Sequence, residues 1–531
     1  METAHVDTFA SDHLPPRAQW PDLPLTLPEL RYPERLNAAR ELLDGRFAER
    51  PCIHGREETW TYAGLRDRAE RVARVLVDDM GLVPGNRVLL HGANTPELVV
   101  CWFAILLAGG VVVATMPLLR ARELGKVIAK AEVSHGLVDA RVAAAAVSAQ
   151  AEQPVLRELL AFGPGGELEE RAAAKPAGFE AVETHAEDVA LIAFTSGTTG
   201  LPKGCVHLHR DILATCDTFA ARILEPQPAD VFTGTAPIAF TFGLGALVLF
   251  PIRFGASLVP IAQPSPDGIV EAIRCHGATT LSTAPTMYRG LLRAGVAEDL
   301  ARLHTCVSAG EPLPAAVAEQ WFEDTGVRIV DGIGSTEMLH IFIAARAEHA
   351  KFGSVGTPVP GYEAMVVDAE MRPLSAGTVG RLAVRGPTGC RYLDDERQSS
   401  YVVDGWNLTG DAFRVDEDGY FFFEARTDDL IVSSGYNISP FEVETALLEH
   451  AAVAECAVVA DPDEERGHVV KAYVVVAEGV AGDGALVQAL QDHVKARIAP
   501  YKYPRRIEWL DALPRTTTGK LQRSVLRTKG E

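Results

Sequence analysis

The chain has few basic residues for its size and no cysteine pattern typical of a disulfide framework. Its 531 residues include 50 lysines and arginines against 71 aspartates and glutamates, a net charge of −21. Nucleic acids and anionic membranes attract basic surfaces, so neither is expected as a partner. The eight cysteines contain no C-x-x-C pair, which excludes the common zinc-binding spacings.

The first residues lack the basic start and apolar core of a signal peptide, which together with the scattered cysteines predicts a cytoplasmic protein. One uncharged run, residues 98–114, has nearly the length of a membrane span. It follows Thr95 and Pro96, a good helix start, and is interrupted by Gly109 and Gly110. A buried helix followed by a buried strand is therefore the better interpretation.

Apolar β-type runs alternate with helical stretches through much of the chain. Runs at 88–90 and 111–114 flank a helical stretch at 95–108, and another helix is expected at 123–131. This alternation predicts βαβ units and largely parallel sheets. Residues 141–186, rich in alanine and glutamate, are expected to form a surface helix and loop.

From residue 353 to 423 the pattern changes to short strands separated by Gly, Pro and Asp turns, which predicts a small β subdomain. Beyond residue 431, strands are expected at 453–460 and 471–477 and a helix at 485–498. A chain of this length exceeds one hydrophobic core. The predicted fold class is α/β: a large N-terminal domain of stacked mixed sheets with helices and the β subdomain, then a small α+β C-terminal domain.

The segment 194–204 is rich in glycine and hydroxyl side chains and follows a buried apolar run at 189–194. It thus lies at the end of a predicted strand, where α/β sheets bind ligands. Glycines let backbone N–H groups converge on an anion, and a lysine adds positive charge. The predicted polyphosphate-binding residues are Thr195, Ser196, Gly197, Thr198, Thr199, Gly200 and Lys203. Gly204 after the lysine excludes a Walker A loop, and a mobile linker is the alternative.

Three further segments carry residue types that ATP chemistry needs. Residues 331–337 place a glycine-lined turn beside a hydroxyl and a carboxylate, which suits an adenosine wall and a Mg²⁺ ligand. Residues 407–411 place Asp411 at a turn, where it can accept bonds from ribose hydroxyls. Residues 514–520 end in Lys520 on another threonine- and glycine-containing loop.

These four segments, in this order and spacing, resemble the adenylate-forming superfamily of acyl-CoA synthetases, luciferases and peptide-synthetase adenylation domains, over about residues 40–525. The resemblance implies that the loop ending at Lys203 holds the β- and γ-phosphates of ATP, that Thr336 contacts the α-phosphate and that Glu337 binds Mg²⁺. It also implies an adenosine site made by Gly310, Glu311, Pro312, Asp331, Gly332, Ile333, Asp411 and Arg426. Asp411 as a turn former and Arg426 as a surface charge are the alternatives.

The resemblance further implies that Lys520 bridges the substrate carboxylate and the α-phosphate, where two anions meet during adenylation. In this family the C-terminal domain then swings about a hinge aspartate, here Asp428, and a segment containing Ser434 and Gly435 lines the channel for CoA. The implied domains are residues 1–425 and 430–531, joined by a hinge at 426–429. Ala425 departs from the glycine that commonly precedes the arginine.

The acyl pocket is expected between the loop 237–245, the turn 308–310 and the run 338–342. Amino-acid-activating relatives place an aspartate in the first loop, whereas this chain has aromatic residues there, so an α-amino acid substrate is disfavoured. The string 332–342 resembles the benzoate–CoA ligase branch, and the wider context is similar to its 2-aminobenzoate–CoA ligases. The implied pocket residues are Phe240, Thr241, Phe242, Gly334, His340 and Ile341. A core histidine without ligand contact is the alternative for His340.

These features predict an ATP-dependent aryl-CoA ligase that uses Mg²⁺ and CoA and converts a benzoate-type acid, favouring 2-aminobenzoate, to its thioester through an acyl-adenylate. Its expected partners are these small molecules, and a homodimer stays open. Salicylate or benzoate as the substrate, and a stand-alone enzyme that loads a carrier protein, are the alternatives. A nucleotide-binding regulator without activity is disfavoured by Glu337 and Lys520.

Overall fold

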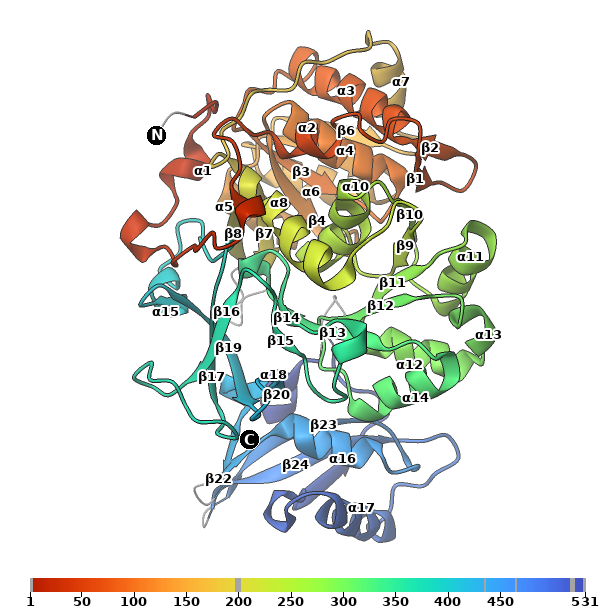
Figure 1. Cartoon of the computed structure of the whole chain (residues 1–531), viewed down its shortest axis with the longest axis vertical. Coiled ribbons are helices and arrows are strands. Elements are labelled where there is room, and N and C mark those ends of the chain that lie inside the picture. Colours follow the sequence, from red (N-terminus) through yellow and green to blue (C-terminus); the bar gives the residue numbers. More distant parts are fainter. Residues whose placement is uncertain (1–2, 196–201, 434–435, 464–465, 516–520, 529–531) are drawn as a thin grey trace.

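The computed structural model describes residues 3–195, 202–433, 436–463, 466–515 and 521–528. Two large sheets and the helices that cover them form most of the chain, and the C-terminal elements gather at the bottom of Figure 1. This arrangement confirms the predicted fold class of a large mixed α/β region followed by a small α+β region. The domain boundaries and the hinge stay predictions.

The first sheet has six strands in the order β6-β5-β3-β4-β7-β8. Neighbouring strands run parallel except for the pair β7 and β8. The loop predicted to bind phosphate therefore connects two antiparallel strands. The strands are β3 (Arg87–His91), β4 (Val111–Thr115), β5 (His135–Asp139), β6 (Glu158–Phe162), β7 (Val189–Thr195) and β8 (Lys203–Leu208).

The second sheet has nine strands in the order β15-β14-β13-β12-β11-β9-β10-β1-β2, and its central strands are parallel. The strands are β1 (Pro51–His54), β2 (Thr59–Thr61), β9 (Val231–Gly234), β10 (Ser257–Pro260), β11 (Thr280–Thr283), β12 (Thr305–Ser308), β13 (Ile329–Gly334), β14 (Ile341–Ala344) and β15 (Thr357–Pro358). Because β12 and β13 are parallel neighbours, their carboxyl ends meet at one edge of the sheet, where ligands bind in this architecture.

The long apolar run forms a buried helix, not a membrane span. Helix α4 (Pro96–Leu107) starts at Thr95, whose hydroxyl accepts from the Leu98 N–H, and strand β4 follows it, as predicted. Ten of its residues are buried in the main core. Among the described helices, none combines the length and apolar character needed to cross a bilayer.

Most of the other helices of this region cover the two sheets, whereas α15 lies beside the β subdomain (Figure 1). They are α1 (Phe9–Asp12), α2 (Ala38–Leu42), α3 (Tyr62–Asp78), α5 (Ala121–Ala131), α6 (Ala143–Glu152), α7 (Leu168–Ala173), α8 (His209–Thr215), α9 (Thr241–Leu244), α10 (Phe250–Arg253), α11 (Pro266–His276), α12 (Pro285–Ala294), α13 (Ala297–Leu300), α14 (Ala315–Thr325) and α15 (Gln398–Tyr401). Two π-helical segments, η4 (Cys216–Leu224) and η5 (Gly245–Leu249), extend α8 and α9.

The predicted β subdomain is a separate antiparallel sheet in the order β16-β17-β19-β18, with β20 on β19. Its strands are β16 (Glu363–Val367), β17 (Gly380–Arg385), β18 (Val402–Val403), β19 (Trp406–Val415) and β20 (Phe421–Arg426). Two local expectations were wrong. Asp411 lies inside β19 and not at a turn, and residues 141–186 include the strand β6.

The C-terminal region has its own core, which helix α16 and strands β23 and β24 form with helix α17. Its elements are β21 (Ile431–Ser433), β22 (Tyr436–Ile438), α16 (Pro440–Leu448), β23 (Val453–Asp463), β24 (Gly467–Val476), α17 (Gly484–Arg497), β25 (Arg506–Trp509) and α18 (Arg523–Thr528). The strand and helix positions predicted here are confirmed. A bond from the Ser439 hydroxyl to the Glu424 carbonyl links α16 to the strand β20.

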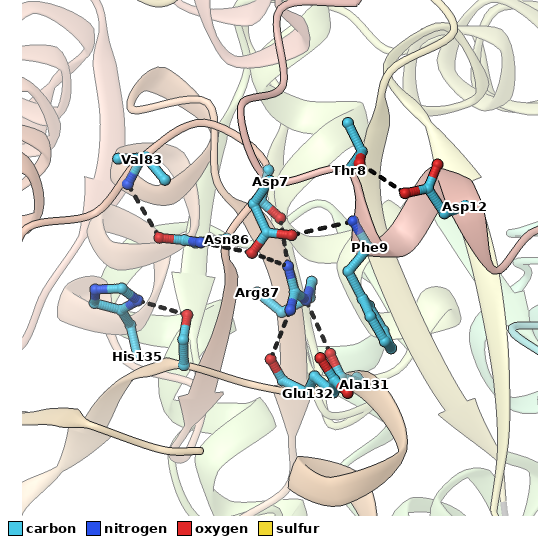
Figure 2. Close-up of polar contacts among 12 residues, drawn as sticks. Asp7, Thr8, Phe9, Asp12, Val83, Asn86, Arg87, Ala131, Glu132 and His135 are labelled. Atoms are coloured by element: carbon cyan, nitrogen blue, oxygen red, sulfur yellow. Dashed lines mark hydrogen bonds and ion pairs between the residues drawn. The ribbon is translucent and has the colours of Figure 1, made fainter.

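The N-terminal segment is tied to the first sheet by polar contacts (Figure 2). Asp7 pairs with the buried Arg87 at 2.5 Å and accepts from the Asn86 amide at 2.8 Å. The Arg87 guanidinium also lies 4.6 Å from the centre of the Phe9 ring. These contacts fix the start of the described chain beside β3.

Candidate functional site

The short turn η6 (Thr336–Met338) connects β13 to β14 and contains two of the predicted catalytic residues. Ser335 caps this turn, because its hydroxyl accepts from the Met338 N–H at 3.3 Å. The next residue, Leu339, has a φ of 68°, which turns the chain sharply into β14. Glu337 is buried. Thr336 and Glu337 thus lie just beyond the carboxyl end of β13. Of the glycine-lined turn predicted at 331–337, residues 331–334 belong to this strand instead.

A buried tyrosine joins Glu337 to the lysine of the phosphate loop. The Tyr392 hydroxyl donates to Oε1 of Glu337 at 2.6 Å, and Nζ of Lys203 donates to the same hydroxyl at 3.3 Å. Burial and the Glu337 charge raise the pKa of Tyr392, so the phenol keeps its proton. Two predicted ATP-site residues are therefore brought together, through a tyrosine that sequence reasoning did not identify.

A second unpredicted residue, His207, holds the backbone of the turn. Its Nε2 is 2.7 Å from the carbonyl oxygen of Thr336. A carbonyl can only accept, so Nε2 carries the proton. Burial lowers the pKa of His207 to about 4, and the ring is neutral near pH 7. His207 lies on β8, four residues after Lys203, so one strand supplies both the contact to the turn and the lysine that contacts Tyr392.

The two segments predicted to flank adenine lie side by side. Ser308, two residues before Gly310, pairs with Asp331 in the parallel register of β12 and β13. Gly310 and Pro312 are exposed, and the Glu311 carboxylate accepts from the Thr286 hydroxyl at 2.7 Å. Burial raises the pKa of Asp331 to about 8. Gly332 and Ile333 follow Asp331 in β13. The residues predicted to flank adenine therefore lie at the adjacent carboxyl ends of β12 and β13.

The predicted ribose ligands, Asp411 and Arg426, face each other across strands β19 and β20. Nη1 of Arg426 donates to Oδ1 of Asp411 at 2.7 Å. Burial raises the pKa of the Asp411 carboxyl, and the Arg426 charge opposes that shift. A side chain at Gly410, whose φ is 76°, would meet the Arg426 guanidinium at 2.9 Å. The two predicted residues therefore form an ion pair.

Aromatic rings enclose His340 on the predicted acyl side. The His340 ring is 4.6 Å from Phe250, 5.2 Å from Phe219 and 5.8 Å from Phe242, measured between ring centroids. Thr241 and Ile341 are buried, whereas Phe240 and Phe242 are half-buried and Gly334 is exposed. The structure brings Phe242 and His340 into direct contact across 98 positions of the chain.

Two glycines leave the space that the histidine occupies. A Cβ at Gly245 would lie 2.3 Å from Cδ2 and 2.6 Å from Nε2 of His340, and a Cβ at Gly334 would lie 2.6 Å from the His340 carbonyl oxygen. Real Cβ contacts are not that short, so a side chain at Gly245 would displace the ring. Gly245 was predicted only as part of a loop; the structure shows why it lacks a side chain.

His340 keeps one ring nitrogen without a partner. Its Nε2 lies 3.4 Å from the carbonyl oxygen of Phe242, which can only accept, so the proton is on Nε2. Its Nδ1 is buried and has no hydrogen-bond partner among the described residues. Burial lowers the pKa of His340 to about 3, so the ring is neutral and Nδ1 is an acceptor.

Several predicted residues lie outside the described part of the chain. They are Ser196, Gly197, Thr198, Thr199, Gly200, Ser434, Gly435 and Lys520. Asp428 lies on the turn η8 (Thr427–Asp429) between β20 and β21. Within the described ranges, His, Cys, Asp and Glu form no cluster of three that could hold a metal by themselves. Glu337 therefore fits a Mg²⁺ ion only as one ligand beside ATP phosphates and water, the usual arrangement for this ion.

Comparison with known proteins agrees with this site. The AMP-binding enzyme family model matches residues 43–391, and the AMP-binding enzyme C-terminal domain model matches residues 442–520. The benzoate–CoA ligase of Thauera aromatica is 36% identical over 528 residues, which cover 95% of this chain and 98% of that protein. The 4-hydroxybenzoate–CoA/benzoate–CoA ligase of Rhodopseudomonas palustris is 33% identical, with 92% and 94% of the two chains covered.

A solved structure shares the whole fold. The anthranilate CoA ligase AuaEII, crystallised with anthranoyl-AMP, superposes with a TM-score of 0.90 at 32% identity and covers 94% of this chain and 98% of its own. The family models together span both the large and the C-terminal regions. The predicted superfamily and branch are confirmed. The chain is an AMP-binding enzyme, an acid–thiol ligase of the branch that contains the benzoate–CoA ligases.

Proposed function

We propose that this enzyme is an aryl-CoA ligase that prefers 2-aminobenzoate. The acid carboxylate attacks the α-phosphate of ATP and pyrophosphate leaves, giving the aryl-adenylate. The thiol of CoA then displaces AMP and forms the thioester. The named activities of the relatives, on benzoate, 4-hydroxybenzoate and anthranilate, support an aromatic acid.

The observation that carries the preference is the buried acceptor Nδ1 of His340. The Cδ2–Nε2 edge of the ring faces Gly245, so Nδ1 lies on the other edge. A buried acceptor without a partner is costly, and a substrate N–H that reaches it removes that cost. The amine of 2-aminobenzoate is neutral near pH 7 and can donate to Nδ1, whereas benzoate has no such donor. The surrounding phenylalanine rings suit a flat aromatic substrate.

Several residues on the phosphate side would bind different parts of ATP during adenylation. Lys203 and the Thr336 hydroxyl would bind the triphosphate, and the Tyr392 hydroxyl holds the Glu337 carboxylate in place. Glu337 would hold the Mg²⁺ that accompanies ATP and neutralises phosphate charge. Asp411 and Arg426 would bind the ribose, and Gly310, Glu311 and Asp331 would flank the adenine.

The remaining roles belong to the C-terminal region. Lys520 would approach the reacting carboxylate and α-phosphate, and removing its charge should cost about 3–4 kcal/mol of barrier. Rotation about Asp428 would then bring Ser434 and Gly435 to the CoA channel. A cytoplasmic location and a homodimer stay predictions.

A panel of acids tests the proposal. Wild-type enzyme is assayed with 2-aminobenzoate, salicylate, benzoate and 4-substituted benzoates for pyrophosphate release and for CoA consumption without any carrier protein. We expect 2-aminobenzoate to exceed benzoate by about fivefold or more in kcat/KM, the value of one hydrogen bond. His340→Leu should abolish that ratio while benzoate remains a substrate.

Three results would count against the proposal. Activity with fatty acids alone would reject the aromatic pocket. Pyrophosphate release without CoA consumption would favour the enzyme that loads a carrier protein. An unchanged ratio of 2-aminobenzoate to benzoate in His340→Leu would remove the acceptor from the explanation.

A further inference from the structure

A charged pair is completely buried behind the catalytic turn. Nη1 of Arg391 donates to Oδ2 of Asp211 at 2.7 Å, and neither side chain has any exposed surface. Burial alone would raise the pKa of Asp211, but Arg391 and Arg210 outweigh it and keep the carboxyl ionised. Removing one partner of such a pair leaves an uncompensated charge in the interior, so the pair holds its surroundings in one arrangement.

This pair lies between the catalytic turn and Tyr392. Oδ2 of Asp211 also accepts from the N–H of Leu208 at 3.0 Å, the residue next to His207, whose Nε2 holds the Thr336 carbonyl. Nδ1 of His207 lies 3.9 Å from the same oxygen and forms no hydrogen bond with it. On its other side, Arg391 precedes Tyr392 in the chain, and its carbonyl accepts from the Val206 N–H at 2.8 Å. The residues on both sides of Glu337, the backbone of Thr336 and the phenol of Tyr392, are thus positioned from one buried centre.

The N-terminal segment reaches the same centre. The Arg391 guanidinium lies 4.5 Å from the centre of the Trp20 ring, and the amide of Gln398 donates to the carbonyl of Gln19 at 2.8 Å. The indole of Trp20 is itself fixed by its bond to the Pro15 carbonyl at 2.8 Å. Because Asp7 is anchored on Arg87 (Figure 2), the segment is tied down at both ends.

We propose that His207, Asp211 and Arg391 form a positioning relay for the Thr336–Glu337 turn, and that Trp20 of the N-terminal segment is its outer member. The relay fixes two groups relative to each other: the Thr336 carbonyl, which His207 holds, and the Glu337 carboxylate, which Tyr392 holds. Adenylation depends on this arrangement more strongly than thioester formation does, because Thr336 would contact the α-phosphate in both steps whereas the Mg²⁺ at Glu337 would be needed only while pyrophosphate leaves. The proposal rests on the proposed adenylation step and not on which aromatic acid is used.

Two substitutions of His207 test the relay. Glutamine places an amide N–H near the position of Nε2, whereas methionine has similar size and no donor. We expect His207→Met to lower acid-dependent ATP–pyrophosphate exchange about 10- to 100-fold, as for a misplaced catalytic group. His207→Gln should recover most of that loss. Conversion of supplied aryl-adenylate and CoA to the thioester should fall by a clearly smaller factor than the exchange rate in His207→Met.

Trp20→Leu tests the outer member, and Trp60→Leu is its matched control. Trp60 is also half-buried and also stacks on an arginine, Arg68, at 4.3 Å, but it lies on β2 at the edge of the second sheet. Losing the ring over Arg391 should lower the exchange rate about three- to tenfold. The control should stay within twofold of wild type.

The relay is wrong if His207→Gln is as impaired as His207→Met, or if both half-reactions fall by the same factor. Equal effects of Trp20→Leu and Trp60→Leu would remove the N-terminal segment from it. If wild type activates no aromatic acid, the proposed function fails, and the relay is judged from ATP binding. Thermal stabilisation by ATP should then be lost in His207→Met and kept in His207→Gln, and the opposite result would overturn the relay.

Discussion

The phosphate side and the acyl side of the site are held by different forces, although residues 334–341 belong to both. On the phosphate side, hydrogen bonds from Tyr392 and His207 fix Glu337 and the Thr336 carbonyl. On the acyl side, His340 is held by ring contacts and by the missing side chain of Gly245. The hydrogen bonds position the ATP-binding groups in the same way whichever acid is bound. The ring packing around His340, in contrast, determines the shape of the pocket that the acid must fit. Substitutions on the two sides should therefore differ in their dependence on the substrate.

The largest effect is expected from Glu337→Gln. The amide oxygen can still accept from Tyr392, so the hydrogen bond and the shape remain while the charge is lost. We expect adenylation to fall about 10²- to 10³-fold, by the same factor for every aromatic acid. Pyrophosphate exchange measured with 2-aminobenzoate and with benzoate checks this, and a loss confined to one acid would contradict the division between the two sides.

Tyr392→Phe removes only the hydroxyl between Glu337 and Lys203. The carboxylate would then lose a bond of 2.6 Å in a buried site, and we expect kcat to fall about tenfold with all acids. Tyr32→Phe is the control, because Tyr32 donates to the Asp217 carboxylate at 2.8 Å away from the site. If both variants lose activity equally, the Tyr392 hydrogen bond stabilises the folded enzyme and does not position the Glu337 carboxylate.

Gly245→Ala addresses the acyl side. The new methyl group would meet the His340 ring at less than 3 Å, so the ring must move and the pocket changes shape. We expect kcat/KM to fall about tenfold for 2-aminobenzoate and less for benzoate, which does not use the histidine. Gly125→Ala is the control, since a Cβ there meets its nearest atom only at 3.6 Å. An equal loss with both acids would mean that His340 does not contribute to the preference for the 2-amino group.

The sequence identified the site residues that belong to short motifs. It missed the residues that contact the site only because the fold brings distant parts of the chain together. Lys203 and Glu337 were predicted because each lies in a short motif with the residue types that phosphate and metal binding require. Tyr392 and His207 carry no local signal. Tyr392 meets Lys203 across 189 positions and His207 meets Thr336 across 129, and only the folded sheets bring them together.

The fold was predictable where hydrophobic periodicity is strong and unpredictable where it is weak. The apolar run of α4 and the strand β7 lie where the sequence placed them. Strand β6 was missed because its stretch is rich in alanine and glutamate, which favour helices. Asp411 was predicted at a turn within the segment 407–411, whereas Gly410 has its positive φ inside the long strand β19.

The smallest effect is expected from Asp331→Asn, and it concerns stability on the adenosine edge that both sides share. The pKa of Asp331 is raised to about 8 by burial, against an ordinary value near 4. Below pH 4 the carboxyl is protonated whether the chain is folded or unfolded. Between pH 4 and 8 only the unfolded chain releases the proton, so this residue increasingly favours unfolding as the pH rises.

The asparagine cannot ionise and escapes this pH-dependent penalty. The difference in Tm between Asp331→Asn and wild type should therefore grow by about 1–3 °C in favour of the variant from pH 5 to pH 8. Thermal unfolding of both proteins at several pH values measures it, with Asp324→Asn on the exposed surface of α14 as the background. A difference that stays constant from pH 5 to pH 8 would mean that Asp331 is already ionised in the folded enzyme, and that the edge beside the catalytic turn carries a second negative charge close to the ATP site.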